Sequence, residues 1–202
     1  MAFSFFMRDQ PTLEQAVEQL IPYANGRSRV RIWDAGCALG QETYTLAMLL
    51  AEKMNRFGFQ NVRIDATDHD HANRFGERVS EAVYPEEELK RTPPELLAKY
   101  FEPAERAGCL RVRETLRSRV RFQYHDLLSL MQPGNDYCLV VCKNVLLHFQ
   151  PAERVKVFHM FHRALAPGGY LVNENTQKLP TEVAHLFAQV VPDAQVYKKL
   201  GN

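Results

Sequence analysis

Polar residues and glycines follow several apolar segments of this chain, at points where a ligand could meet them. The segment RIWDAGCALGQETY ends an apolar run in Asp34 and places Gly36 and Gly40 before a long periodic stretch. Glycines at such a turn let the backbone approach a ligand, and the helix start beyond it favours negative charge. The spacing fits neither the GxGxxG dinucleotide fingerprint nor the P-loop, since no Gly-Lys-Ser/Thr follows. The alternative is that the two glycines merely shape a tight turn between a strand and a helix.

Glu42 and Asp68 are the two carboxylates best placed to hold a ligand. Glu42 falls in the first turn of the predicted helix, where it either stabilises the helix dipole or accepts hydrogen bonds from a cationic or hydroxyl-bearing ligand. Asp68 ends the next apolar run, VRIDATD, where an acidic side chain commonly takes both ribose hydroxyls of an adenosine moiety. It could instead cap a helix beginning near His71. Its position at the end of a strand favours the ribose interpretation.

Histidines are further candidates for chemistry. His69 and His71 lie close together, and His159 and His162 are one helical turn apart. Neither pair has a cysteine or carboxylate at a spacing typical of a zinc site, so we expect no metal. His148 follows a buried run near the predicted cleft and is either a catalytic group or a structural histidine beside apolar residues.

Alternating strands and helices must position these residues. We predict helices at 12–23, 40–56, 72–83, 151–165 and 180–190, and strands at 29–35, 62–68, 136–149, 170–175 and 194–197. Because parallel neighbours need crossover helices to reconnect, this alternation predicts an α/β doubly wound sheet. Such sheets bind ligands at the carboxyl ends of their strands. The residues at those ends are Asp34 to Gly40, Asp68, Asp126, Lys143 and Asn144.

Length and composition indicate one domain over 1–202, with a small helical and hairpin-like insertion at about 84–123. The 25 Lys and Arg nearly balance the 24 Asp and Glu, which argues against a nucleic-acid partner. The insertion is locally basic because of Arg111, Arg113, Arg117 and Arg119. The simplest interpretation is a solvated face. No run approaches the roughly 20 apolar residues of a membrane span. The four cysteines are scattered, as suits a reducing compartment, so we expect a cytoplasmic protein without membrane insertion.

Several motifs together resemble those of the CheR-type S-adenosylmethionine-dependent methyltransferases, which esterify glutamates of bacterial chemoreceptors in chemotaxis signal transduction. The stretch AGCALGQETYT at 35–45 is similar to the family's Ala-x-Cys-Ser-Thr-Gly-Glu-Glu-Pro-Tyr-Ser turn, which is fairly specific. AFSFFMRD at 2–9 is similar to Asn-x-Thr-x-Phe-Phe-Arg-Asp, and ATDHD to Ala-Thr-Asp-Ile-Asp. CKNVLLHF is similar to Cys-Arg-Asn-Val-Leu-Ile-Tyr-Phe, and LAPGGYL to Leu-x-Pro-Gly-Gly-Tyr-Leu. The likeness covers nearly the whole chain but only the family's catalytic part, so we expect its helical N-terminal domain to be absent.

The resemblance implies a Rossmann-like class I methyltransferase sheet and a role for each matched residue. Glu42 would meet the amino-acid portion of the cofactor, S-adenosylmethionine, and Asp68 its ribose. Asp126 and Leu127 would border the adenine. The cofactor-binding residues implied are Ser4, Arg8, Gly36, Gly40, Glu42, Asp68, Asp126, Leu127, Lys143 and Asn144. The catalytic residues implied are Arg8 and His148. Arg8 would orient the acceptor carboxylate, whereas its own sequence context indicates only a surface ion pair.

This sequence departs from the family at several motif positions. His148 stands for the usual Tyr, Asp126 for Asn, and Lys143 for an Arg whose planar fork would pair bidentately with a carboxylate. NENTQ replaces the family's Gly-His-Ser-Glu. The implied activity is a protein-glutamate O-methyltransferase that acts on a chemoreceptor-like protein and releases S-adenosylhomocysteine. Two alternatives stay open: a sensor or adaptor that binds the cofactor without transfer, and a methyltransferase with a small-molecule acceptor.

Overall fold

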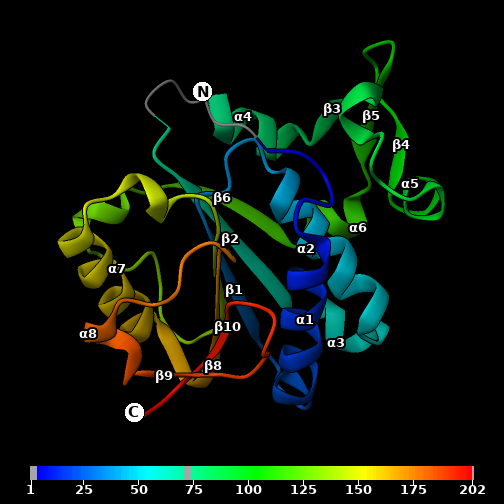
Figure 1. Ribbon diagram of the computed structural model, residues 1–202. Helices are drawn as coiled ribbons and strands as arrows, with labels where there is room; N and C mark the ends of the chain where they lie inside the picture. The colour runs from blue at the N-terminus through cyan, green and yellow to red at the C-terminus, as the bar shows by residue number, and fades with distance from the viewer. Residues whose placement is uncertain (1–3, 71–73, 202) are drawn as a thin grey trace.

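The computed structural model of the chain describes residues 4–70 and 74–201 (Figure 1). Its centre is a seven-stranded sheet in the order β6-β2-β1-β7-β8-β10-β9. The first five strands pair in parallel, whereas β10 runs antiparallel to both β8 and β9. The strands are β1 (Val30–Ala35), β2 (Val62–Asp68), β6 (Val120–Tyr124), β7 (Tyr137–Cys142), β8 (Leu165–Asn173), β9 (Phe187–Gln189) and β10 (Val196–Lys199). The predicted α/β doubly wound class is confirmed.

Helices cover the two faces of this sheet. In Figure 1, α1, α2 and α3 lie on one side of the strands and α7 and α8 on the other. Helix α1 buries Leu13, Val17 and Leu20, whose helical spacing gives one apolar face. Every residue of β7 is buried, as expected of a central parallel strand. The helices are α1 (Gln10–Ala24), α2 (Gln41–Lys53), α3 (Arg56–Gln60), α4 (Arg74–Glu81), α5 (Pro94–Tyr100), α6 (Glu114–Arg117), α7 (Pro151–Ala164) and α8 (Thr181–Ala184).

A small antiparallel sheet, ordered β3-β5-β4, projects beside α2 and α6 (Figure 1). It consists of β3 (Val83–Pro85), β4 (Phe101–Pro103) and β5 (Cys109–Val112). The predicted insertion at 84–123 contains this sheet, but its last residues belong to the central sheet instead. Val120 and Phe122 pack against the buried Ala66 and Val79, and β6 pairs in parallel with β2.

Two predicted elements differ from the structure near the ends of the chain. The helix expected at 180–190 is only the short α8, because Phe187 is buried and β9 pairs with β10. Helix α1 begins at Gln10 rather than after Thr12, with Asp9 at the N-cap position. Thr12 lies inside the helix, where its hydroxyl oxygen accepts a hydrogen bond from Asn175 Nδ2 at 2.9 Å.

The connections around β7 also differ from expectation. The strand predicted for 136–149 ends at Cys142, because Asn144 adopts φ 60° and a 3₁₀ turn, η3 (Leu146–His148), follows. Between β6 and β7 the chain forms another 3₁₀ turn, η2 (Leu127–Ser129), and no crossover helix. Among the helices within 4–70 and 74–201, none is long and apolar enough to cross a membrane.

Candidate active site

A crevice opens at the carboxyl ends of β1 and β7. The chain runs outward from β1 through β2 to β6 and then returns to β7 on the other side of β1. Open α/β sheets bind ligands at such a reversal of strand order. The crevice has a volume of about 540 Å³ and brings together most of the residues that the sequence singled out. Its lining is Ser4, Arg8, Gly36, Cys37, Ala38, Glu42, Asp68, Lys143, Asn144, Val145, Leu147 and His148.

A narrower, mainly apolar slot of about 140 Å³ adjoins the crevice. It contains the predicted Asp126 and Leu127, and it shares Gly36, Asp68 and Val145 with the crevice. The apolar slot suits a flat apolar group, and the crevice with its charged lining suits a polar one.

Gly40 lies in the lining of neither space. It is the N-cap residue of α2 at φ 89°, and a Cβ there would come within 2.8 Å of the Tyr84 hydroxyl. That hydroxyl donates to the carbonyl of Leu39 at 2.8 Å. The structure therefore gives Gly40 a packing reason that the sequence did not reveal.

The turn after β1 is tied to the end of β2. Both Gly36 N–H and Cys37 N–H donate to the carbonyl of Thr67, at 2.8 and 3.0 Å. Asp68 Oδ2 accepts the N–H of Ala38 at 2.8 Å, and its Oδ1 accepts the N–H of His69 at 2.7 Å. Counting the hydrogen bonds of the described residues, each carboxylate oxygen keeps a lone pair for a ligand, because it has two. Burial raises the pKa of Asp68, and these N–H groups oppose that shift.

Asp70, rather than Asp68, serves the start of α4. Its carboxylate accepts the N–H groups of Arg74, Phe75 and Gly76 at 2.7 to 3.0 Å. The described start of α4 is therefore capped by Asp70, and the helix-capping alternative for Asp68 stays a prediction. His71, at which that alternative placed the helix start, lies outside the described residues.

Two buried carboxyls lie close together: Glu42 lines the crevice, and Asp34 is near enough for its charge to act on Glu42. Asp34 Oδ2 accepts a hydrogen bond from the Thr43 hydroxyl at 2.5 Å, and its Oδ1 is buried without a partner among the described residues. Burial raises the pKa of Asp34 to about 7. Burial and the charge of Asp34 raise the pKa of Glu42 to about 8. At neutral pH the pair therefore holds at least one proton, and a cationic ligand group would favour its release.

Cations from distant parts of the chain face these carboxyls. The Lys143 side chain is fully buried, with Nζ 2.9 Å from Asp9 Oδ2 and 3.9 Å from Glu42 Oε2. Arg8 Nη2 donates to Asn144 Oδ1 at 2.6 Å. Arg8 is partly buried, so the surface position that sequence alone suggested is wrong. Arg8 and Asp9 of the N-terminal segment thus bind Asn144 and Lys143, which follow β7.

Glu174, which sequence reasoning missed, supports these contacts from the end of β8. Its Oε2 accepts the N–H of Asn144 at 2.9 Å and so holds that residue in its left-handed conformation. The other oxygen is buried without a partner among the described residues, and burial raises the pKa of the carboxyl. The sequence could have identified Glu174 by its position near the end of a predicted strand, as it did Asp34. His148 is exposed at the rim.

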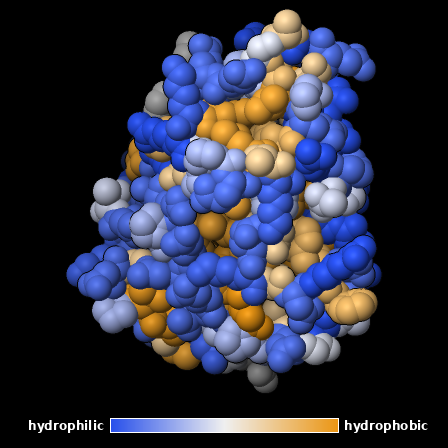
Figure 2. All heavy atoms as spheres, turned by 90° about the vertical axis from the view of Figure 1, so that its right-hand side faces the viewer, coloured by the Kyte–Doolittle hydropathy of each residue, from blue (hydrophilic) through white to orange (hydrophobic). Residues whose placement is uncertain are grey.

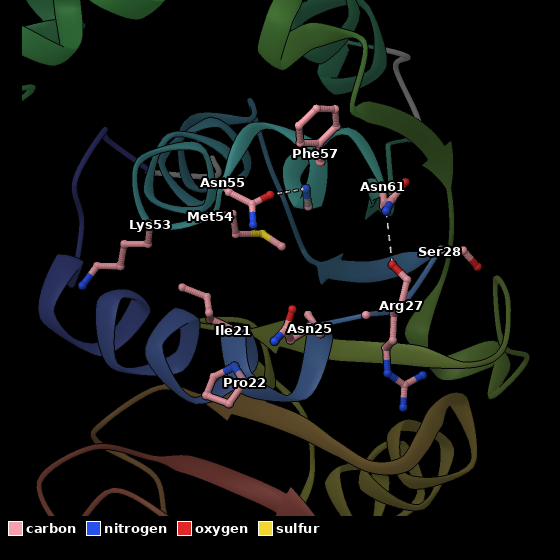
Figure 3. Close-up of a pocket in the computed structure, with 13 residues that line it drawn as sticks. Ile21, Pro22, Asn25, Arg27, Ser28, Lys53, Met54, Asn55, Phe57 and Asn61 are labelled. Atoms are coloured by element: carbon pink, nitrogen blue, oxygen red, sulfur yellow. Dashed lines mark hydrogen bonds between the residues drawn. The ribbon is translucent and has the colours of Figure 1, made fainter.

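A larger hollow of about 660 Å³ lies at the opposite edge of the sheet, between the end of α1 and the segment from α2 to α3 (Figure 3). Its polar groups are engaged in local structure: Asn55 Oδ1 accepts the N–H of Gly58, and Asn61 Nδ2 donates to the carbonyl of Arg27. The surrounding face is mainly hydrophilic with separate apolar patches (Figure 2). The carboxyl edge, rather than this hollow, has the converging charges of an active site.

Metal ligands do not gather in the part of the chain that is described: no group of three His, Cys, Asp or Glu side chains is placed to hold an ion there. His162 Nε2 lies 2.8 Å from the carbonyl oxygen of Leu200. The predicted lack of a metal stays a prediction.

Comparison with known proteins gives a family. Residues 2–195 match the family model described as CheR methyltransferase, SAM binding domain. Chemotaxis protein methyltransferase 1 of Pseudomonas aeruginosa is 33% identical over 175 residues, which are 83% of this chain and 63% of that protein. The chemotaxis protein methyltransferase of Borreliella burgdorferi is 32% identical over 163 residues, 79% of this chain and 56% of that protein. An uncharacterized 104.1 kDa protein of Rhodobacter capsulatus is 33% identical over 82% of this chain and 17% of that protein. The chain thus spans less than two thirds of each of these relatives.

Proposed function

The chain belongs to the CheR methyltransferase family, and from this premise we propose that it transfers the methyl group of S-adenosylmethionine to a glutamate carboxylate of a chemoreceptor-like protein. The observation that carries the proposal is the crevice, where Arg8, Glu42 and Asp68 converge from three segments far apart in the sequence. We expect this reaction in the cytoplasm.

The residues present fit this cofactor. Asp68 is aimed at the crevice by two N–H groups and suits the ribose diol. The apolar slot beside Asp126 and Leu127 suits the adenine. Glu42, next to the unpartnered oxygen of Asp34, suits the cofactor's ammonium group. When bound, the cofactor supplies a methyl group on a positively charged sulfur, which is a good leaving group.

The protein's own work is to align the acceptor and exclude water. A glutamate carboxylate is already ionised at neutral pH, so the transfer needs no general base. Arg8, held by Asn144 in the lining of the crevice, carries a guanidinium group whose charge and planar fork suit the incoming carboxylate. Lys143 lies against Asp9 and Glu42, so we propose that it holds the residues of the crevice in place and does not bind the acceptor. His148 at the rim is proposed to contact the acceptor.

The test is transfer of tritium from methyl-labelled S-adenosylmethionine to a soluble cytoplasmic fragment of a bacterial chemoreceptor. We expect label that alkali releases as volatile methanol, because carboxyl methyl esters are alkali-labile. A fragment with glutamine at its methyl-accepting glutamates is the matched acceptor control. Label that resists alkali, or label on that control fragment, would overturn the proposed acceptor.

Variants of the enzyme separate binding from transfer. Arg8→Ala should lower transfer about 10- to 100-fold, the value of a charge-assisted hydrogen bond, while S-adenosylhomocysteine still binds. Asp68→Asn should weaken S-adenosylhomocysteine about tenfold in calorimetry. Asp70→Asn should leave that affinity unchanged and cost about 1 kcal/mol of stability, because both carboxylate oxygens accept N–H groups of α4 and an amide NH2 cannot accept one. Tight binding with no transfer to any acceptor would favour the sensor or adaptor alternative.

A further inference from the structure

Five arginines surround a hollow of about 570 Å³ at the amino ends of β1, β2 and β6. They come from three separate segments of a chain whose net charge is only +1. Asp65 is the one carboxylate in the lining. The arginines are Arg29, Arg31, Arg63, Arg119 and Arg121. Ser28 and Asn61, labelled in Figure 3, line both this hollow and its larger neighbour.

The sheet register places these side chains in rows. Arg31 of β1 lies directly beside Arg63 of β2, and Arg119 immediately precedes Val120, the partner of the residue after Arg63. In the next row Arg121 lies beside Asp65. Like charges directly opposite each other on neighbouring strands destabilise a sheet. The row therefore carries a local penalty that an anion would remove.

Within the described part of the chain, no helix lies over this face of the sheet at β2 and β6. Parallel sheets are normally covered on both faces, but the connection from β6 to β7 holds only the 3₁₀ turn η2. Trp33, on the same face of β1, packs against Phe161 of α7. Farther out, Arg63 and Arg121 are exposed. The hollow is thus open to a ligand from solvent.

The single carboxylate is already engaged. Asp65 Oδ2 is 2.7 Å from Arg31 Nη2 and accepts the Tyr137 hydroxyl at 2.7 Å. Arg31 is the one arginine of the hollow that forms an ion pair within the described part of the chain. Arg63 and Arg119 both donate to the carbonyl of Gln60, at 3.1 and 2.6 Å, so their guanidinium groups crowd together. Burial and the charge of Arg63 lower the pKa of Arg119.

We propose that this hollow binds a compact phosphate-bearing anion. Guanidinium groups match phosphate oxygens with paired hydrogen bonds, and a small polyanion can reach several of these arginines at once. The site lies at the opposite edge of the sheet from the crevice, so it does not depend on the proposed methyl transfer.

The test is calorimetry of the full chain with inorganic pyrophosphate at about 50 mM salt, where screening is weak. Arg63→Ala and Arg121→Ala should each weaken binding about tenfold, since each removes a charged hydrogen-bonding group. Arg63→Lys should retain part of the affinity, because it keeps the charge and loses the fork. Arg56→Ala is the matched control: Arg56 is exposed on α3 and outside the hollow, so binding should not change.

Two further measurements exclude other sources of signal. Asp68→Asn must bind pyrophosphate as the parent chain does, which separates the hollow from the crevice. A second arm with adenosine diphosphate tests whether the phosphate is borne by a nucleotide: tighter binding than pyrophosphate, lost in Arg63→Ala, indicates a nucleotide ligand. No binding at millimolar pyrophosphate, equal binding by the Arg63→Ala and Arg56→Ala chains, or preferential binding of an oligoglutamate peptide would overturn the proposal.

Discussion

At the carboxyl edge of the sheet Lys143 is buried between Asp9 and Glu42, whereas at the amino edge Arg63 lies exposed beside Arg119. The first arrangement joins opposite charges across 134 residues of chain. The second follows from strand register and places like charges side by side. The ion pairs of Lys143 at the carboxyl edge therefore stabilise the fold, whereas the like charges at the amino edge destabilise it unless an anion binds. Five predictions break or sharpen this comparison.

The largest expected effect is on a glycine of the carboxyl edge. Gly36 has φ 98°, and a Cβ there would lie 2.2 Å from Val145 Cγ2. We expect Gly36→Ala to lower the free energy of unfolding by about 3 kcal/mol, from backbone strain and overpacking together. Gly26, before β1, has φ 78° and open space around it, so Gly26→Ala should cost only about 1 kcal/mol. Equal losses in urea unfolding would contradict the difference.

Removing the buried cation should have the next largest effect. Lys143→Met leaves the buried Glu42 and Asp34 without their positive neighbour. We expect a loss of about 2 kcal/mol at pH 7, below the range for fully buried pairs because Asp9 is half-exposed. Thermal and urea unfolding measure it. A chain as stable as the parent would show that the carboxyl edge does not need its ion pairs.

The pH dependence of the carboxyl edge should be intermediate. The folded-state pKa values of Asp34 and Glu42 lie above their unfolded values, so the ligand-free fold binds protons more tightly than the unfolded chain. This contribution to stability is fully present below about pH 4 and is lost as the pH rises through about 7 to 8. Unfolding at pH 5 and pH 8 tests the sign.

Binding of the cofactor's ammonium should reverse that preference. Because it favours ionised Glu42, S-adenosylhomocysteine should release a proton and bind up to about tenfold more tightly per pH unit between pH 6 and 8. Calorimetry in buffers of different ionisation enthalpy counts the protons. Glu42→Gln should weaken the pH dependence of the affinity. An unchanged pH dependence would show that Glu42 is not the group that releases the proton.

The smallest effect is at the amino edge and has the opposite sign. Without an anion, Arg63→Ala should raise the free energy of unfolding by about 0.3 kcal/mol, because a repulsion is removed. The gain should shrink at 0.5 M NaCl, where surface charges are screened. Arg56→Ala, measured alongside, should show no gain. A loss of stability in Arg63→Ala would mean that its contacts with the Gln60 carbonyl outweigh the repulsion.

The carboxyl edge was largely predictable because its signals are local. An apolar run that ends in Asp68, followed by a helix pattern, identifies a strand end without any knowledge of its neighbours. The contact of Arg8 with Asn144 depends on how the N-terminal segment crosses the sheet, and the support from Glu174 depends on the left-handed turn at Asn144. Neither is visible in a short stretch of sequence.

The amino edge was hidden for the same reason. The basic stretch was interpreted as a solvated face, and part of it is accounted for by ion pairs of Arg113 with Glu102 and of Arg117 with Glu114. Arg119 differs because the register places it in the row of Arg31 and Arg63. Pairing also decided the end of the chain, where Phe187 begins an edge strand instead of continuing a helix.

Gly40 and Tyr84 carry an evolutionary consequence. The ring hydroxyl of Tyr84 occupies the space that a side chain at position 40 would need, and it holds the carbonyl of Leu39. Selection should therefore act on the two positions together, although Gly40 follows a strand of the central sheet and Tyr84 lies in the small sheet. An alanine at position 40 would also lie 3.0 Å from Val79 Cγ2 and would be strained at φ 89°, so position 40 should stay glycine in every lineage that keeps the tyrosine at 84.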